Sequence, residues 1–318
     1  MDKFVLEFER PIFEIQKKIA ELKEFSLNEN LEVQQEIERL ESKAQKLKLD
    51  IYSKLSRWQR VQLARHPDRP YTLDYINRMV TDFVELHGDR AFGDDPAIVA
   101  GLGKIDGRPI AIVGHQKARE TKEKLRRNFG MPHPEGYRKA MRVMKIAAKF
   151  NRPILSLVDT IGAYPGLGAE ERGQGEAIAR NLFEMSHLPV PIIVVIIGEG
   201  ASGGALGIGV GDRILMLENT WYSVISPEGC ASILYKDSSK AEIVAEAMRL
   251  IPDDLMQMQV IDRIIKEPVG GAHSDYDQSA AILKTAVLEE MDALGHIQPR
   301  DLVEQRVEKF GKMGAWKE

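Results

Sequence analysis

Two glycine-rich segments hold the residues of this 318-residue chain that are best placed to do chemistry. One runs from Asp159 to Ala169 and the other from Gly198 to Gly207, and each follows a short apolar stretch typical of a buried strand. Glycine lets a ligand approach the backbone closely. Amides at the start of a helix have no partner within the helix and favour negative charge. The two segments therefore predict a cup of amide donors, either an anion cradle or an oxyanion hole.

The second segment first suggests a dinucleotide site. Its glycines match the fingerprint Gly198-x-Gly200-x-x-Gly203, and Glu218 lies near the offset of a ribose-binding acid. However, the helix that should follow would contain several more glycines, each costing roughly 1 kcal/mol relative to alanine. A strand resumes near Arg213, which leaves little room for that helix. This interpretation is therefore disfavoured.

The same segment also resembles a nucleophile elbow, because Gly200-x-Ser202-x-Gly204 has its spacing. A serine hydrolase would need a histidine and an acid beside Ser202, and nothing in the sequence singles out one of the candidate histidines, His115, His187 and His273. The alternative is that Ser202 is a small residue capping the next helix.

A third interpretation needs no side-chain nucleophile. The backbone amides of Gly203 and Gly204 would stabilise an enolate or ureido oxygen as charge develops on it. Removing one such donor typically costs ~3 kcal/mol of barrier. We prefer this interpretation because it uses the glycines directly, and we take Gly203 and Gly204 as the candidate catalytic residues.

The segments must be positioned by alternating strands and helices, which is the pattern of an α/β layered domain. Asp106 and Gly107 predict a hairpin turn between the first two strands. We expect strands at 98–105, 110–114, 154–158, 192–197, 214–217 and 221–225, and helices at 74–87, 136–151, 173–186, 238–250 and 276–293.

The first 65 residues differ from the rest because they contain no glycine and are highly charged. Apolar residues repeat there at helical spacing in two runs, which predicts an antiparallel helical hairpin that packs as an arm. We therefore divide the chain into an arm, 1–65, and a carboxyl-terminal domain, 66–318. The runs are Ile12, Ile15, Ile19 and Leu22, and then Ile37, Leu40, Ala44, Leu47 and Ile51.

Composition excludes several classes of protein. The formal net charge of −4 gives no reason to expect nucleic acid or an anionic membrane as a partner. The single cysteine, Cys230, excludes an internal disulfide and a cysteine-based zinc ribbon, so we expect a cytoplasmic protein with no metal in this chain. The longest apolar run, 188–197, is too short to span a membrane.

Several longer motifs closely resemble the α subunits of bacterial acetyl-CoA carboxylase carboxyltransferase, over essentially the whole chain. They include HQKARETKEK (115–124), RRNFGMP (126–132), PEGYRKA (134–140), GAYPG (162–166), GAEERGQ (168–174), EGASGGAL (199–206) and SPEGCASIL (226–234). The family commonly has proline where Ile161 stands and glycine where Ala201 stands, which affects local loop shape rather than the glycine pair.

The resemblance implies a crotonase-like fold of the ClpP/crotonase superfamily, a spiral of stacked ββα units preceded by the helical hairpin. It implies an α2β2 heterotetramer that moves a carboxyl group from carboxybiotin, on a biotin carboxyl carrier protein, to acetyl-CoA, giving malonyl-CoA for fatty-acid synthesis. Biotin carboxylase is a further partner, and the β subunit carries a zinc ribbon and the oxyanion hole on the thioester side.

The resemblance also implies roles for named residues. Gly203 and Gly204 match the pair whose amides hold the biotin ureido oxygen, and the loop containing Gly166, Gly168 and Ala169 lines the same pocket. Tyr164 could form a wall of the biotin slot. From the residues themselves, the basic cluster at 116–127 either contacts CoA phosphates or the acidic carrier domain, or is a solvated helix face. Its candidate contacts are Lys117, Arg126 and Arg127. A separate crotonase-fold hydrolase, hydratase or isomerase and a non-catalytic scaffold remain as alternatives.

Overall fold

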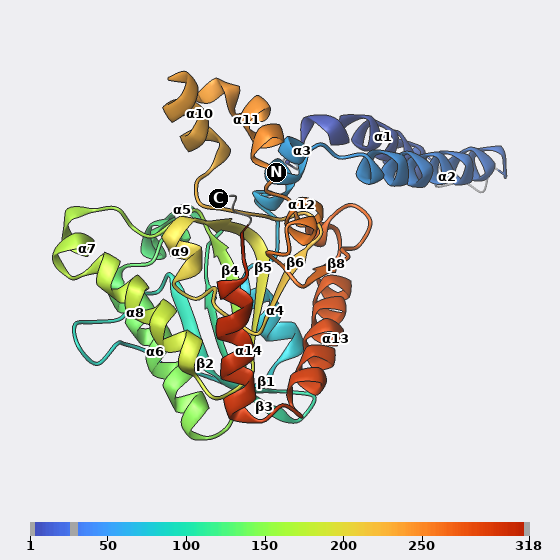
Figure 1. Ribbon diagram of the computed structural model, residues 1–318. Coiled ribbons are helices and arrows are strands. Elements are labelled where there is room, and N and C mark those ends of the chain that lie inside the picture. The colour runs from blue at the N-terminus through green and yellow to red at the C-terminus, as the bar shows by residue number, and fades with distance from the viewer. Residues whose placement is uncertain (1–3, 26–30, 315–318) are drawn as a thin grey trace.

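A mixed sheet of eight strands forms the centre of the computed structural model, which describes residues 4–25 and 31–314 (Figure 1). The strand order is β1-β2-β3-β4-β5-β6-β8, and β7 pairs with β5. The first three strands pair antiparallel and the later pairs are parallel. The strands are β1 (Thr81–Glu85), β2 (Ile98–Ile105), β3 (Arg108–His115), β4 (Ile154–Thr160), β5 (Ile192–Ala201), β6 (Arg213–Leu217), β7 (Trp221–Ser223) and β8 (Arg263–Ile265).

Helices cover both faces of the sheet and extend beyond its ends. α6 and α8 lie on one face and α4 and α13 on the other (Figure 1). The helices are α1 (Arg10–Phe25), α2 (Leu31–Ser53), α3 (Arg57–Ala64), α4 (Thr72–Met79), α5 (Thr121–Arg126), α6 (Pro134–Lys149), α7 (Leu167–Glu171), α8 (Gln174–His187), α9 (Ser202–Leu206), α10 (Pro227–Tyr235), α11 (Ala241–Met248), α12 (Pro252–Gln257), α13 (Tyr276–Leu294) and α14 (Pro299–Gly311).

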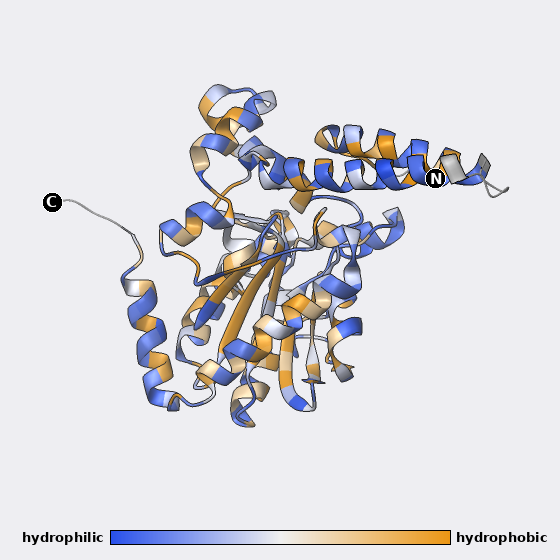
Figure 2. Cartoon of the chain, turned by 90° about the vertical axis from the view of Figure 1, so that its right-hand side faces the viewer, coloured by the Kyte–Doolittle hydropathy of each residue, from blue (hydrophilic) through white to orange (hydrophobic). Residues whose placement is uncertain are grey.

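The sheet divides the core into two layers. On β3, Ala111 and Val113 pack toward α6, whereas Ile110 and Ile112 pack toward α4 and α13. Every residue of β4 and β5 is buried. Both faces of these strands are therefore covered, as their uninterrupted apolar sequences predict, and Figure 2 shows the hydrophobic strands enclosed by helices with hydrophilic outer surfaces.

One predicted helix is wrong. Residues 74–87 were expected to form a single helix, but α4 ends at Met79 and residues 81–85 form β1, which pairs antiparallel with β2. The reason lies in β2: a Cβ at Gly101 would lie 2.4 Å from the carbonyl oxygen of Val84 and 2.7 Å from the ring of Phe83. The glycine therefore makes room for an edge strand that local helical spacing could not reveal.

The amino-terminal arm is the predicted helical hairpin. α1 and α2 pack through a seam that includes Ile19, Ile37, Leu40 and Ala44, and the pair projects away from the sheet (Figure 1). The connecting segment 26–30 lies outside the described residues. The third helix packs differently, because Val61 and Ala64 of α3 join a cluster with Trp221 on β7. The boundary at residue 65 stays a prediction, and in the structure α3 packs on the body of the protein.

The other predicted elements lie where the sequence placed them, with ends shifted by a few residues. α3, α7, α10, α12, α14 and β8 were not predicted. No helix within the described ranges is long and apolar enough to cross a membrane.

Candidate active site

The two glycine-rich segments meet at one edge of the sheet. β4 and β5 are parallel neighbours, so the loops that follow them lie side by side, and Thr160 pairs with Gly200. Their backbones touch: a Cβ at Gly204 would lie 2.3 Å from the carbonyl carbon of Gly162 and 2.4 Å from the amide nitrogen of Ala163. Glycine at 204 is therefore needed for the two loops to come together.

The turn between β5 and α9 presents the Gly203 and Gly204 amides. Ser202 has φ of +59°, a left-handed conformation that is unfavourable for a serine and turns the chain sharply from strand to helix. Ser202, Gly203 and Gly204 then form the first turn of α9, whose amides have no partner within the helix. The amides of Gly203 and Gly204 are thus among those at the start of the helix, and Gly204 is buried against the first loop.

Two side chains from the neighbouring helices hold α9 in place. The hydroxyl of Tyr137 on α6 donates a hydrogen bond to the Gly204 carbonyl oxygen, 3.1 Å away. The side-chain amide of Asn181 on α8 donates to the carbonyl oxygens of Gly207 and Tyr137, each at 2.9 Å. Both side chains are buried, so the position of the amide pair is set by the core.

The first loop is fixed by its own polar contacts. The Thr160 hydroxyl donates to the carbonyl oxygen of Gly130 at 2.6 Å and accepts from the Gly162 amide at 3.1 Å. The amide group of Gln174 donates to the Tyr164 carbonyl oxygen at 2.9 Å. The ring of Tyr164 lies 4.5 Å from that of His133. Of the other predicted pocket residues, Gly166 precedes α7, while Gly168 and Ala169 lie in its first turn.

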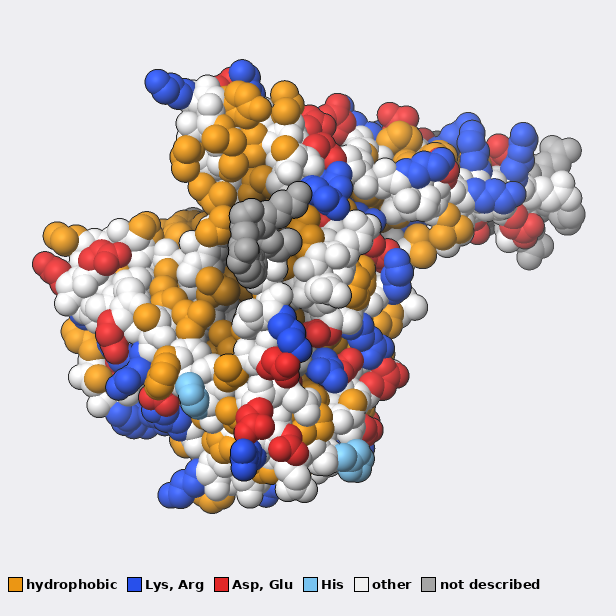
Figure 3. Space-filling model, viewed as in Figure 1, with side chains coloured by type: hydrophobic (Ala, Val, Ile, Leu, Met, Phe, Trp, Pro, Cys, Tyr) orange, Lys and Arg blue, Asp and Glu red, His pale blue; other side chains and the backbone are white. Residues whose placement is uncertain are grey.

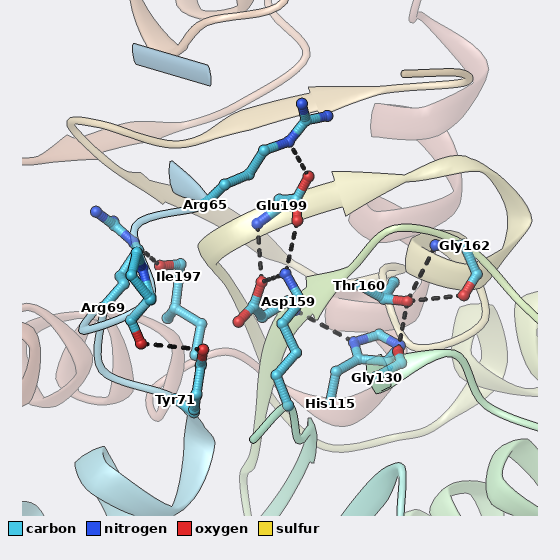
Figure 4. Close-up of polar contacts among 12 residues, drawn as sticks. Arg65, Arg69, Tyr71, His115, Gly130, Asp159, Thr160, Gly162, Ile197 and Glu199 are labelled. Atoms are coloured by element: carbon cyan, nitrogen blue, oxygen red, sulfur yellow. Dashed lines mark hydrogen bonds and ion pairs between the residues drawn. The ribbon is translucent and has the colours of Figure 1, made fainter. Parts of the chain in front are cut away.

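A chain of charged residues lies beside the first glycine loop, and Figure 4 shows its members Arg65, Asp159 and Glu199. The ammonium of Lys117 lies 2.7 Å from Oδ1 of Asp159 and 2.8 Å from Oε1 of Glu199. The other Glu199 oxygen accepts from Nε of Arg65 at 2.6 Å, and Arg65 pairs in turn with Glu228 at 2.5 Å. We call these five residues the charge network; it links the ends of β3, β4 and β5 to α3 and α10.

Burial and ion pairing have opposite effects on the pKa values of the residues in this network. Burial lowers the pKa of Lys117, but the charges of Asp159 and Glu199 outweigh it and raise the pKa above its ordinary value. Burial raises the pKa of Glu199, but the adjacent Lys117 and Arg65 cations hold that pKa below its ordinary value. Both groups are therefore charged at neutral pH, and each depends on its partners.

His115 lies beside the network and is uncharged. Its side chain is fully buried at the end of β3, and Nδ1 accepts a hydrogen bond from the Asp159 amide at 3.3 Å (Figure 4). Burial lowers the pKa of His115 to about 3; the nearby Gly204 backbone raises this pKa by less, and the charge of Lys117 lowers it by less still. An imidazole with this pKa is not a base that titrates near neutral pH.

A pocket of about 260 Å³ opens above the network. Arg65, Lys117 and Glu199 contribute its charged wall, and Ile161 from the first glycine loop is among its apolar residues. Lys124 and Phe129 also line it. The pocket therefore joins the predicted loop to the charge network and to one cation of the basic cluster.

The basic cluster does not form a single face. Lys117 is held by the two carboxylates, and Arg127 donates to the Pro96 carbonyl oxygen at 2.8 Å. Arg126 is exposed, and among the described residues it forms an ion pair only with Glu123, three residues earlier on α5, at 3.1 Å. Arg126 is thus the member of the predicted set whose guanidinium remains accessible to a ligand.

The alternatives for the second segment find little support. Among the hydrogen bonds of the described residues, none joins Ser202 to a histidine, and His115 is already engaged with Asp159. α9 is only five residues long and β6 begins at Arg213, so the long helix of a dinucleotide-binding unit is not formed. In the part of the chain that the structure describes, no group of three or more His, Cys, Asp or Glu side chains is placed to hold a metal ion.

Sequence reasoning missed the partners of Lys117. Asp159 and Glu199 each stand at or near the end of a completely buried strand, where a charged residue is unusual, and that position was the available signal. Arg65 and Glu228 carried no comparable signal because they lie far from both loops in the sequence.

Comparison with known proteins identifies close relatives of the chain. A family model described as acetyl co-enzyme A carboxylase carboxyltransferase-like matches residues 5–314. A protein of Geobacillus sp. (strain WCH70) is 58% identical over 309 residues, covering 97% of this chain and 95% of the relative. One from Geobacter metallireducens is 57% identical over 315 residues, covering 99% of each. Both relatives are named acetyl-coenzyme A carboxylase carboxyl transferase subunit alpha.

Solved structures with lower identity share the fold. The transcarboxylase 12S core with methylmalonyl-coenzyme A bound has a TM-score of 0.57 at 19% identity, covering 70% of this chain and 41% of that one. A Pseudomonas malonate decarboxylase hetero-tetramer in complex with coenzyme A has a TM-score of 0.55 at 18% identity, covering 68% of this chain and 86% of that one. These likenesses confirm the predicted crotonase-like α/β fold.

Proposed function

Since the chain belongs to the family of acetyl-CoA carboxylase carboxyltransferase α subunits, we propose that it forms one side of a carboxyltransferase active site that a β subunit completes. The complex transfers the carboxyl group of carboxybiotin to acetyl-CoA. In the reaction the N–C bond of carboxybiotin breaks and a C–C bond forms at the acetyl methyl carbon. The proton of that methyl group passes to the biotin nitrogen, so the products are biotin and malonyl-CoA.

The contribution of this chain is electrostatic. As the N–C bond breaks, negative charge develops on the ureido oxygen of biotin, and the amides of Gly203 and Gly204 donate hydrogen bonds to it. Preorganised donors of this kind lower a barrier because they need no rearrangement when the charge appears. The observation that carries the proposal is the backbone contact between Gly204 and Gly162, which fixes the amide pair against the first loop.

The remaining predicted residues have supporting roles in this proposal. Arg126 contacts a phosphate of CoA, and Lys117 positions the loops through its two carboxylate partners. Arg127 supports the base of α5 through the Pro96 carbonyl. The biotin pocket is lined by Tyr164, Gly166, Gly168 and Ala169.

The proposed partners follow from the family. The relatives are named as α subunits, so a β subunit acts with this chain. We assign to that subunit the zinc ribbon and the thioester-side oxyanion hole, in an α2β2 assembly. Carboxybiotin arrives on a carrier protein charged by biotin carboxylase, and the reaction takes place in the cytoplasm.

Reconstitution tests this function. The chain and the β subunit from the same organism are purified separately and together, and malonyl-CoA is measured from carboxybiotinyl carrier protein and acetyl-CoA. We expect product only when both subunits are present. An assembled complex that makes no malonyl-CoA would contradict the proposal, as would acetyl-CoA hydrolysis by the chain alone. The latter result would favour a self-sufficient hydrolase acting through Ser202.

A further inference from the structure

His115 is a buried histidine to which the proposed mechanism gives no role. It ends β3 and its side chain is fully buried, so the histidine side chains visible on the surface in Figure 3 belong to other positions. Thr72 on α4 holds its backbone, because the Thr72 hydroxyl donates to the His115 carbonyl oxygen at 2.6 Å. Among the described residues, Nε2 of His115 is one of the buried side-chain atoms that make no hydrogen bond. Such an atom in a folded core requires an explanation.

The hydrogen bond at the other ring nitrogen shows where the proton of the ring lies. Nδ1 lies 3.3 Å from the amide nitrogen of Asp159, a group that can only donate (Figure 4). Nδ1 is therefore the acceptor, and the neutral ring carries its proton on Nε2. His115 thus places an N–H donor in the core without an acceptor. An apolar side chain of similar size would avoid that cost, so packing alone does not account for a histidine at this position.

The backbone of Gly204 lies beside the ring. It raises the pKa of His115, and the backbone of Leu157 does so more weakly. A neutral backbone group has this effect when it accepts a hydrogen bond from the protonated ring, so the group concerned is a carbonyl oxygen. Leu157 is two residues before Asp159 on β4, on the Nδ1 side of the ring. The Gly204 carbonyl oxygen is therefore the acceptor that Nε2–H faces.

The same carbonyl oxygen already has one buried donor. It accepts a hydrogen bond from the Tyr137 hydroxyl at 3.1 Å, and its second lone pair can accept another. A pair of donors matters at this residue because the peptide planes of a glycine rotate more freely than those of other residues. The carbonyl and the amide of Gly204 flank one Cα atom, so donors that hold the carbonyl also fix the direction of the N–H group.

We propose that His115 is a positioning residue for carboxyl transfer, an inference that rests on the proposed function. When carboxybiotin binds, Nε2–H closes onto the Gly204 carbonyl oxygen beside the Tyr137 hydroxyl. The two donors then direct the Gly204 amide at the ureido oxygen on which charge develops. Hydrogen bonds in catalytic sites are often long before the substrate binds and tighten in the complex. His115 itself neither contacts the substrate nor transfers a proton.

Two variants separate this role from a structural one. The side-chain amide of glutamine reaches the place of Nε2, so His115→Gln keeps a donor for Gly204 and loses the contact with Asp159. The side-chain amide of asparagine reaches only the place of Nδ1, so His115→Asn keeps an acceptor for the Asp159 amide and loses the donor. His296→Asn, at an exposed position, is the control. Malonyl-CoA formation is measured at saturating β subunit, and thermal melting confirms that each variant is folded.

We expect His115→Asn to lower kcat at least about ten-fold, because a small displacement of a catalytic group is costly. The KM values for acetyl-CoA and the carrier protein should not change, since the hydrogen bond acts mainly in the transition state. His115→Gln should recover most of kcat, and the control should match the wild type. The proposal is overturned if the asparagine variant is as active as the glutamine variant, or if only KM changes.

A second measurement does not depend on turnover. Nitrogen-15 NMR of the full chain with labelled histidine identifies which ring nitrogen of His115 is protonated, and its signals are assigned by their loss in His115→Gln. We expect the proton on Nε2 at neutral pH, and a proton on Nδ1 overturns the proposal. A wild-type complex that assembles and forms no malonyl-CoA contradicts the proposed function, and with it this role, whatever the variants do.

Discussion

The ammonium of Lys117 lies 2.7 Å from Oδ1 of Asp159, and this ion pair joins the end of β3 to the end of β4 beside the glycine loops. Glu199 at the end of β5 shares the same ammonium. A single cation thus ties together three neighbouring strands at the edge where the site lies. The chemistry assigned to the backbone amides depends on how firmly these strand ends are held.

Replacing Lys117 with methionine should destabilise the protein strongly. The change keeps most of the volume but leaves two buried carboxylates without their shared cation, and breaking such a pair typically costs about 3–5 kcal/mol. The free energy of unfolding, measured with urea, should fall by that amount. Lys122→Met, at an exposed position of α5, is the control and should change it by less than about 0.5 kcal/mol. A Lys117→Met protein as stable as the control would show that the network contributes nothing.

Gly203→Ala and Gly204→Ala should differ sharply. A Cβ at Gly204 would collide with the backbone of Gly162, whereas a Cβ at Gly203 has the Ile178 side chain as its nearest neighbour, at 3.6 Å. Gly204→Ala must therefore displace the amide pair, and we expect kcat for malonyl-CoA formation to fall about 100-fold. Gly203→Ala should stay within a few-fold of the wild type. Equal effects of the two changes would contradict the role of the loop contact.

The pH dependence of the free energy of unfolding should show that His115 is buried in its uncharged form. Its pKa is about 3 in the folded chain, against about 6.5 in the unfolded chain. The unfolded state therefore binds the extra proton between these values, and stability falls as the pH drops from 6.5 toward 3, by about 1 kcal/mol per pH unit. His115→Gln removes this contribution. Urea midpoints at pH 7, 6 and 5 should fall less steeply for the variant, and parallel curves for the two proteins would refute the assignment.

Arg126→Ala should raise the KM for acetyl-CoA several-fold with little change in kcat. The guanidinium is exposed, and within the described part of the chain its one ion pair is with Glu123, so it is available to pair with a phosphate. Arg300→Ala provides the control, because Arg300 is also exposed and pairs with Glu304 within its own helix. Steady-state kinetics of the assembled complex measure both constants. An unchanged KM in the Arg126 variant would contradict the CoA contact and indicate that the basic cluster is a solvated helix face.

The elements that depend on local sequence pattern were predicted correctly. The buried strands β4 and β5, the hairpin at Asp106–Gly107 and the seam of the arm follow from apolar spacing and turn residues, and all three are present. The edge strand β1 was mistaken for helix because its formation depends on Gly101 in another strand. Arg65 and Glu228 could not be assigned, because only the fold brings them to Glu199.

The role of Ser202 distinguishes the two mechanisms that the second glycine-rich segment permits, catalysis by backbone amides and attack by a serine nucleophile. If the amides act, the hydroxyl is dispensable and Ser202 serves mainly as the strained residue of the turn. Its conformation also predicts that Ser202→Gly keeps the fold, since glycine adopts positive φ readily.

The most direct measurement is therefore the single-turnover rate of carboxyl transfer by Ser202→Ala in the assembled complex, with labelled carboxybiotinyl carrier protein and acetyl-CoA. We predict that labelled malonyl-CoA forms within a few-fold of the wild-type rate, because the Gly203 and Gly204 amides remain in place. A loss of about 10⁴-fold or more, as expected for removal of a serine nucleophile, would contradict the account.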